Sequence, residues 1–319
     1  MPLSTLTGVI APVPSPPPRP PRDHTPAYQP GTMRATWTDP GGTEWELTGP
    51  YEQHGRLTTE QISGWGATPV SHVLDPLDRG GAQVRHVRAE PRTILWPLNI
   101  YGDTHLEFTR RWRQLMRAFT ATSQRGPGVL TVWRPDGTAR AIDAYYEDGF
   151  GGEAGEGWLY ANPVLALLCP DGYWRDRSPL VVRREWGPPA ASYLDPFPTV
   201  SSGNVLGDTV ITNAGDVQAW PSWTITGPAQ AITAVNHSAD AAFTLTYALS
   251  AGQAITITTA GARPSVRGPD GQSLIGALDW PAAELWPLLP GDNSVAFNLE
   301  GAGAGAAVEL VYHRRYESW

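Results

Sequence analysis

The stretch GPGVLTVWRPDGTARAIDAYY, from Gly126 to Tyr146, carries the clearest fold signal in the chain. Two runs rich in apolar and β-branched residues, Val129–Arg134 and Thr138–Tyr146, flank the turn Pro135–Gly137. Proline fixes one backbone angle and glycine tolerates a positive φ, so this order predicts a β-hairpin. The 32 prolines and 34 glycines punctuate the rest of the 319 residues in the same way. A mainly β protein of short strands joined by turns is therefore expected.

One amphipathic helix is expected before this hairpin, from about Thr104 to Ala121, with Thr104 and Glu107 at capping-box spacing. Apolar side chains follow at i, i+4, i+7, i+8 and i+11, which is the repeat of a helix with one buried face: Phe108, Trp112, Leu115, Met116 and Phe119. Arginines occupy the opposite face: Arg110, Arg111, Arg113, Arg117 and, just beyond the helix, Arg125. These arginines form either a solvated face or contacts to acidic groups of a neighbouring subunit, for which Arg110, Arg113 and Arg117 are the candidates.

Further strands are expected around the helix: Arg34–Trp37 and Glu44–Leu47 as a hairpin, then His72–Leu74, Ala82–Ala89, Arg92–Ile100 and Trp158–Cys169. The acidic, glycine-rich segment Asp148–Gly157 lacks the carboxylate spacing of a calcium loop, so it is interpreted as a flexible hairpin loop. Apolar neighbours place the single cysteine, Cys169, in a buried strand. No histidine or helix start lies nearby in the sequence, so Cys169 is interpreted as a small core residue rather than a nucleophile.

The second half contains closely spaced short strands and no helical repeat, which predicts a two-sheet antiparallel sandwich. The expected strands are Thr209–Thr212, Trp223–Gly227, Ile232–Asn236, Phe243–Leu249, Ala254–Thr259, Ser265–Arg267, Ser273–Leu278, Ser294–Leu299 and Ala307–His313. Alternation is cleanest around Ile255 and Ile257, whose side chains should face the core while the intervening threonines face solvent.

Length and composition divide the chain into two domains. Residues 1–31 form a proline-rich arm, which is expected to be extended and could alternatively be a ligand for an SH3-like domain. Residues 32–176 form the first domain, residues 177–200 a linker rich in proline and charge, and residues 201–319 the sandwich.

Charge and hydropathy exclude several classes of function. The net charge is −8, and no arginine stripe is long enough to follow a nucleic-acid backbone. All 23 basic residues are arginine, which indicates a GC-rich gene and suggests an actinobacterial host. The longest apolar run, Val164–Cys169, is too short to span a membrane, and no signal peptide is recognisable. Folding in the cytoplasm without disulfides is expected.

Enzymatic function is not expected, because the chain has no zinc-protease, nucleophile-elbow or P-loop motif and its seven histidines are scattered. Gly301–Gly305 starts like a nucleotide-binding loop, but an expected strand follows it where a helix is needed. Asp143, Glu147 and Asp148 could mimic a glycosidase pair, although such neighbours are common. No catalytic residue, cofactor or metal ligand is assigned.

A carbohydrate-binding module is the alternative, because a sandwich rich in aromatic residues could hold host cell-wall sugar by ring stacking. The candidate residues are Trp220, Trp223, Trp280 and Trp286. Most of them precede or adjoin a proline, which favours anchors at strand ends over sugar sites. Exposure discriminates the two hypotheses, since a lectin needs at least one flat, exposed ring.

Several sequence strings together resemble one family. In the first domain they are L-x-V-W-x-P-D-G-x-x-R from Leu130 to Arg140 and the closing CPDGYW of Cys169–Trp174. In the second domain they are Asn213–Asp216 before Trp220-Pro221, then Ile225–Pro228 and Trp286–Asn293. In order and spacing these strings resemble the distal tail proteins of siphophages, which have a ring-forming first domain and a galectin-like sandwich. The long proline-rich arm departs from that family.

The resemblance implies a structural minor tail protein in a homohexameric ring at the virion tail tip, made in the host cytoplasm. The ring would lie between the tail tube and the baseplate hub or tail fibre, with a lumen for DNA. Its implied partners are other copies of the chain, the tail tube protein, the hub or tail-associated protein and the tape measure protein. A prophage remnant, a tailocin or a gene transfer agent would use the same fold.

Overall fold

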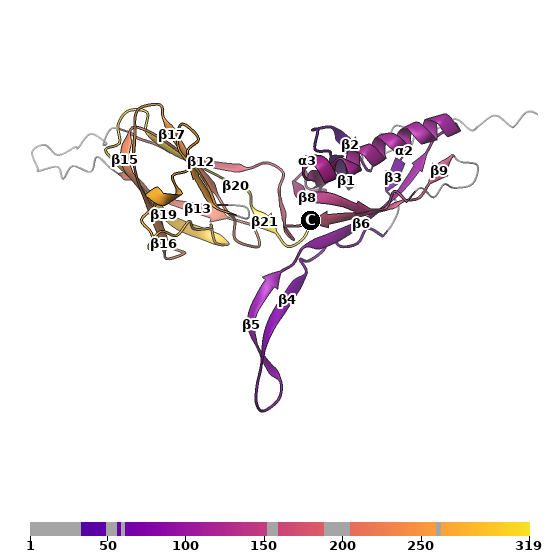
Figure 1. Cartoon of the computed structure of the whole chain (residues 1–319), viewed down its shortest axis with the longest axis horizontal. Coiled ribbons are helices and arrows are strands. Elements are labelled where there is room, and N and C mark those ends of the chain that lie inside the picture. Colours follow the sequence, from indigo (N-terminus) through magenta and orange to yellow (C-terminus); the bar gives the residue numbers. More distant parts are fainter. Residues whose placement is uncertain (1–32, 49–55, 59–60, 152–158, 188–204, 260–262) are drawn as a thin grey trace, which may run out of the picture.

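The computed structural model describes residues 33–48, 56–58, 61–151, 159–187, 205–259 and 263–319. It contains two β-rich lobes, and a two-stranded hairpin projects away from both (Figure 1). The chain is mainly β with one long helix, as predicted. The proline-rich arm and most of the acidic loop fall outside the described residues.

The first lobe is built on an antiparallel sheet whose main path runs in the order β2-β1-β7-β8-β10-β6-β3. Its strands are β1 (Arg34–Thr38), β2 (Glu44–Glu46), β3 (Arg56–Thr58), β6 (Arg92–Tyr101), β7 (Gly128–Trp133), β8 (Ala139–Asp148) and β10 (Val164–Cys169). The hairpin predicted from Gly126–Tyr146 is β7–β8 at the centre of this sheet. Its turn is fixed locally, because Gly137 has φ +85° and Thr138 N–H donates to Asp136 Oδ1 at 2.9 Å.

Helix α2 (His105–Thr120), followed by the short α3 (Thr122–Arg125), packs on this sheet with Phe108, Leu115 and Phe119 buried. Phe119 stacks on Trp37 of β1 with ring centroids 4.5 Å apart. The predicted capping box at the start of α2 forms only in part, because its second hydrogen bond involves a neighbouring residue. Thr104 accepts a bond from the Glu107 N–H at 3.2 Å, but the Glu107 carboxylate accepts the N–H of Asp103, at 2.9 Å, rather than that of Thr104.

The strand predicted over Trp158–Cys169 is two strands in the described part: β9 (Tyr160–Ala161) and β10. β9 pairs with the end of β6, and β10 pairs with the rest of β6 and with β8. The break falls at Pro163, which has no N–H to donate to a neighbouring strand.

The second lobe is the predicted sandwich of two antiparallel sheets. One sheet has the order β12 (Leu180–Glu185), β20 (Ala307–Tyr312), β14 (Ser222–Thr226), β17 (Ala254–Thr258) and β18 (Ser265–Arg267). The other has the order β13 (Val205–Asn213), β19 (Gly291–Glu300), β15 (Ala229–Asn236) and β16 (Ala241–Leu249). Ile255 and Ile257 are buried, as expected from the alternation of β17. Trp223 lies in the common core and meets Phe243, Trp286 and Phe297 edge to face.

Two predictions for this half are wrong. The stretch 177–200 is not a linker throughout, because β12 lies in it and pairs with β20 from Leu180↔Tyr312 to Glu185↔Ala307. Charged residues gave β12 a linker-like composition, but Leu180 and Val182 pack on the sandwich core. The strand predicted over Ser273–Leu278 is instead a 3₁₀ turn, η2 (Ile275–Ala277). The adjacent Leu274 and Ile275 both pack on the core, which an alternating strand does not allow.

The predicted domain boundaries 32–176 and 201–319 also do not account for the end of the chain, which leaves the second lobe and packs in the first. The short β21 (Arg315–Tyr316) returns to the first lobe and pairs with β11 (Trp174–Asp176), which itself pairs with β8. The last residue, Trp319, stacks on Trp65 with centroids 4.5 Å apart. The C-terminal residues therefore complete the first lobe after the sandwich has been built.

Buried Arg92 binds this returning segment. Its guanidinium donates to Gly66 O (2.7 Å), Thr68 Oγ1 (2.7 Å) and Glu317 O (2.9 Å). Arg140 adds a bond to Ser318 O at 2.6 Å. Two arginines of the first lobe thus hold the end of the chain through its backbone carbonyls.

Candidate interaction surfaces

The predicted interface arginines lie along the exposed side of α2. Arg110, Arg113 and Arg117 are exposed, and none has an ion-pair partner among the described residues. Arg111 departs from the predicted pattern, because it is half-buried and already paired. It lies 2.6 Å from the Glu107 carboxylate and donates to Tyr101 O at 2.8 Å. Arg111 therefore stabilises the helix start, whereas the other three remain free to meet an external acidic group.

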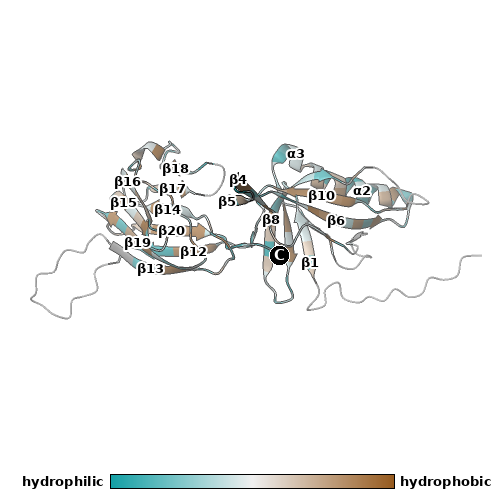
Figure 2. Ribbon diagram, turned by 90° about the horizontal axis from the view of Figure 1, so that it is seen from below, coloured by the Kyte–Doolittle hydropathy of each residue, from teal (hydrophilic) through white to brown (hydrophobic). Residues whose placement is uncertain are grey.

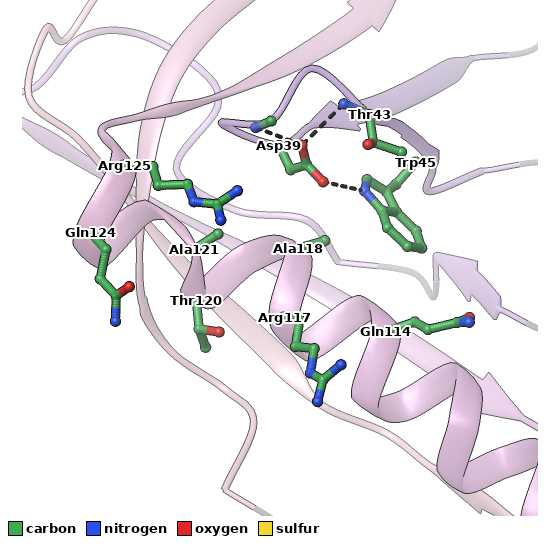
Figure 3. A pocket seen from close by; sticks show the side chains of 11 residues that line it. Asp39, Thr43, Trp45, Gln114, Arg117, Ala118, Thr120, Ala121, Gln124 and Arg125 are labelled. Atoms are coloured by element: carbon green, nitrogen blue, oxygen red, sulfur yellow. Dashed lines mark hydrogen bonds between the residues drawn. The ribbon is translucent and has the colours of Figure 1, made fainter.

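A pocket of about 660 Å³ opens between the C-terminal part of α2 and the β1–β2 turn (Figure 3). Asp39 forms one wall and is held rigidly. Its carboxylate accepts bonds from Gly41 N–H (2.8 Å), Thr43 N–H (3.0 Å) and Trp45 Nε1–H (3.0 Å). Arg117 of α2 and Arg125 at the end of α3 also line the pocket, and the Arg125 guanidinium lies close to the Asp39–Gly41 turn. An open pocket with two cationic side chains suits an acidic protein segment better than a reaction that must exclude water.

The described residues contain no group of three or more histidine, cysteine or acidic side chains that could hold a metal ion. Cys169 is buried as predicted, and burial raises the pKa of its thiol to about 12. Such a thiol stays protonated at neutral pH and is a poor nucleophile. Asp143 lies 2.5 Å from Arg175, so one of the acidic residues considered for a glycosidase pair is engaged in an ion pair.

The four tryptophans considered for sugar stacking separate by exposure. Trp223 and Trp286 are 1% and 0% exposed, so the sugar-binding interpretation is wrong for these two. Trp220 is half-buried. Trp280 is 56% exposed, and its Nε1–H donates to Ile275 O at 2.8 Å, which fixes the ring. Of the four, Trp280 alone meets the exposure requirement of a lectin site.

The sequence did not reveal one surface, the hairpin of β4 (Val70–Pro76) and β5 (Ala82–Ala89). Both strands were predicted, but the exposure of their apolar residues was not. Leu77 in the turn and five apolar residues of the strands are at least one-third exposed: Val70, Val73, Leu74, Val84 and Val87. The alternation of apolar residues signals a covered sheet face, and nothing in it tells whether the cover comes from the same chain.

None of the helices in the described part of the chain is long and apolar enough to cross a membrane.

No protein-family model and no curated protein matches the chain. Solved structures do match. The crystal structure of the SPP1 Dit protein, titled a paradigm of the hub adsorption apparatus in phages infecting Gram-positive bacteria, aligns with a TM-score of 0.60 over 89% of this chain and 99% of that one. The chain has the Dit fold.

Chains of two baseplate structures match as well. One belongs to the activated baseplate of phage p2 with strontium, with a TM-score of 0.52 over 88% of this chain and 98% of that one. The other belongs to the activated baseplate of phage P2 with calcium, with a TM-score of 0.54 over 90% and 100%. Sequence identity is 12% to SPP1 Dit, 13% to the strontium structure and 12% to the calcium structure. The shared property is therefore the fold, with both lobes in the same order.

Proposed function

We propose that this chain is a structural minor tail protein of a siphophage-type tail, with the role of a distal tail protein. Its copies form a hexameric ring that joins the tail tube to the baseplate hub or tail tip. The observation that carries this proposal is the near-complete two-lobe overlap with SPP1 Dit, at 89% of this chain and 99% of that one. A fold shared by only one lobe would support a common module and nothing more.

The surfaces of the first lobe support an assembly role. Arg110, Arg113 and Arg117 are charged, exposed and unpaired within the described residues, so they add little to the stability of a single copy. In the assembly they contact acidic groups of a neighbouring subunit. The tail tube protein, the hub or tail-associated protein and the tape measure protein are the proposed partners beyond the ring, and the virion tail tip is the proposed location.

The mass of the full chain in solution tests this proposal. Light scattering coupled to size exclusion should detect a species about six times the 34.5 kDa protomer mass. The charge-reversal variant R110E/R113E/R117E should weaken assembly while leaving the melting temperature unchanged. Arg267→Glu on the exposed edge of the sandwich is the control and should assemble normally. A strict monomer at all concentrations, alone and with the tube protein, would refute the proposal.

Exposed Trp280 favours a second function for the sandwich, binding of host cell-wall carbohydrate. The two functions are compatible, because Trp280 lies in the second lobe and the proposed ring contacts lie in the first. Pulldown of the full chain by isolated cell walls tests it. Trp280→Ala should abolish retention on the cell walls without changing the assembly state. Equal retention of the wild type and the variant would refute a sugar-binding role for Trp280.

A further inference from the structure

Among the described residues, six of the twelve exposed large apolar side chains lie in the β4–β5 hairpin and its turn. Leu74, Val70 and Val84 are 55%, 51% and 50% exposed. Within the described residues, β4 and β5 pair only with each other, and none of their side chains belongs to either core. A two-stranded sheet without further packing is marginally stable in water. The hairpin therefore has the features of an element that is covered in an assembly.

The pairing register sorts the hairpin into two unlike faces. Residues opposite each other in an antiparallel pair share a face, as do residues two apart along a regular strand. The register shifts between Val73 and Leu74, where β5 has one extra residue, Arg85, so Val84 and Val87 share a face although they are three apart. One face accordingly carries Val70, His72, Leu74 and Pro76 of β4 with their partners Ala89, Val87, Val84 and Ala82 of β5. This set is apolar except for His72 and is called the hairpin apolar face below.

The opposite face of the hairpin has Ser71, Val73 and Asp75 opposite Arg88, His86 and Gln83, so it is polar except for Val73, which is 44% exposed. Asp75 forms an ion pair with Arg85. Ser71 donates to the Glu90 carboxylate at 2.5 Å. Sheets with one apolar and one polar face normally pack the apolar face on a second layer and leave the other in water. The hairpin apolar face thus needs a cover, and the polar face does not.

A second uncovered apolar surface lies on the main sheet of the first lobe. β10 has the sequence VLALLC and is brown along its length in Figure 2. Strands that are apolar on both faces are usually buried on both. One face of β10, with Leu165, Leu167 and Cys169, is fully buried in the core. On its other face Val164 is 51% exposed, and the neighbouring Leu95 of β6 is 40% exposed.

The register places five apolar side chains together on this second surface. Leu95 is opposite Ala166, and Pro97 is opposite Val164. Leu168 follows two residues after Ala166 on the same face. Leu95, Pro97, Val164, Ala166 and Leu168 are called the outer sheet face below. No helix of the described chain covers this face, because α2 packs on the buried side.

The hairpin cannot cover the outer sheet face of its own chain. β5 continues into β6 through the two residues Glu90 and Pro91. Two residues are too few to fold the hairpin back over the strand that it leads into, and Figure 1 shows it pointing away from both lobes. The two uncovered surfaces therefore meet between copies. Because they are different surfaces, the contact is head to tail, and a head-to-tail contact closes into a ring or continues as a filament.

The charges around the two surfaces are complementary. Arg79 lies in the turn of the hairpin beside Asp78, and both side chains are exposed. Over Val70–Ala89 the hairpin has three arginines, Arg79, Arg85 and Arg88, against Asp75 and Asp78, which gives a formal charge of +1. Glu147 and Asp148 are exposed at the end of β8. Glu147 borders the outer sheet face, because its carboxylate lies 3.5 Å from the Thr93 hydroxyl on the exposed side of β6. A hairpin with a net positive charge and an acidic border favour this docking over a hairpin-to-hairpin contact, in which like charges would meet.

We propose that the hairpin apolar face of one copy docks on the outer sheet face of the next copy around the ring. This inference rests on the proposed function and specifies the contact between subunits. Each copy gives one hairpin and receives one, so every protomer of a closed ring has both apolar surfaces covered.

Engineered cysteines test the contact in the full chain. The variant V84C/L95C should form covalent ladders between copies under mild oxidation, up to the full ring. Val84→Cys mixed with Leu95→Cys should give covalent dimers, and each alone should give none. The natural Cys169 adds no background, because it is buried and the pKa of its thiol is raised to about 12. The pair V84C/V181C is the control, since Val181 is more accessible than Leu95, at 56% against 40% exposed, but lies on the sandwich.

A second variant separates assembly from folding. V84D/V87D should reduce the ring to monomers with an unchanged melting temperature, whereas the control Val210→Asp, at a 62% exposed valine of the sandwich, should leave the ring intact. Dimers from Val84→Cys alone would show hairpin-to-hairpin packing and overturn the inference. A wild-type ring without the V84C/L95C ladder would overturn it while leaving the proposed function in place. A wild type that never assembles would overturn both.

Discussion

Replacing Arg92 by methionine should destabilise the chain far more than replacing an exposed arginine. Arg92 is 2% exposed and donates three short hydrogen bonds, to Gly66 O, Thr68 Oγ1 and Glu317 O, and a longer one of 3.4 Å to Gly64 O. Bonds from a charged donor contribute about 1.5–3 kcal/mol each. Burial disfavours the charged guanidinium, which is why the pKa of Arg92 is lowered. Replacing this charge by an apolar side chain removes that desolvation cost and so offsets part of the loss. We expect a net loss of about 3 kcal/mol in the free energy of unfolding.

Urea unfolding monitored by tryptophan fluorescence measures this loss, with Arg111→Met as the matched control. Arg111 is half-buried in an ion pair with Glu107, so its replacement should cost about 1 kcal/mol or less. Limited proteolysis supplies a local readout, because Arg92→Met should release the C-terminal segment around Glu317 before the lobes unfold. Equal losses for the two variants, or an uncut C-terminus in Arg92→Met, would refute the role assigned to Arg92.

Three further predictions concern the core, the thiol and the helix face. Trp223→Ala should lower the free energy of unfolding by about 3–5 kcal/mol, whereas Trp280→Ala should change it by less than about 1 kcal/mol. Thermal melts distinguish the two variants, and equal losses would contradict the burial of Trp223. The Cys169 thiol has its pKa raised from 9.0 to about 12, so its contribution to stability is full below pH 9 and is lost as the pH rises toward 12. Iodoacetamide should accordingly label Cys169 at pH 8 only after unfolding, and rapid labelling of the native chain would be inconsistent with this. R110E/R113E/R117E should elute later than wild type in size exclusion while keeping its melting temperature; a lowered melting temperature would show that these arginines support the fold instead.

Local signals made much of the fold predictable. The β7–β8 hairpin follows from its turn residues, and α2 follows from its apolar repeat and its cap. Features that depend on distant partners were missed. β21 is two residues long and pairs with Trp174 and Arg175, well over 100 positions earlier, so nothing in its own sequence marks it as a strand. β12 was missed because it lies in a segment rich in proline and charged residues, which was interpreted as a linker.

The candidate surfaces were predictable to a smaller extent. Trp280 and Trp286 each precede a proline, yet one is exposed and the other is in the core. Sequence context cannot separate them, since exposure depends on which strands cross above each ring. The hairpin strands were predicted as short runs between glycine and proline turns, but an apolar face has the same alternating pattern whether its cover comes from its own chain or from another. Only the three-dimensional arrangement shows that the described residues of a single copy leave this face uncovered.

The most direct test of the central claim is negative-stain electron microscopy of the purified full-length chain. The account predicts closed rings whose class averages have six-fold symmetry and a central opening. Particles of single two-lobed protomers at every concentration, with no rings after addition of the tail tube protein, would contradict it.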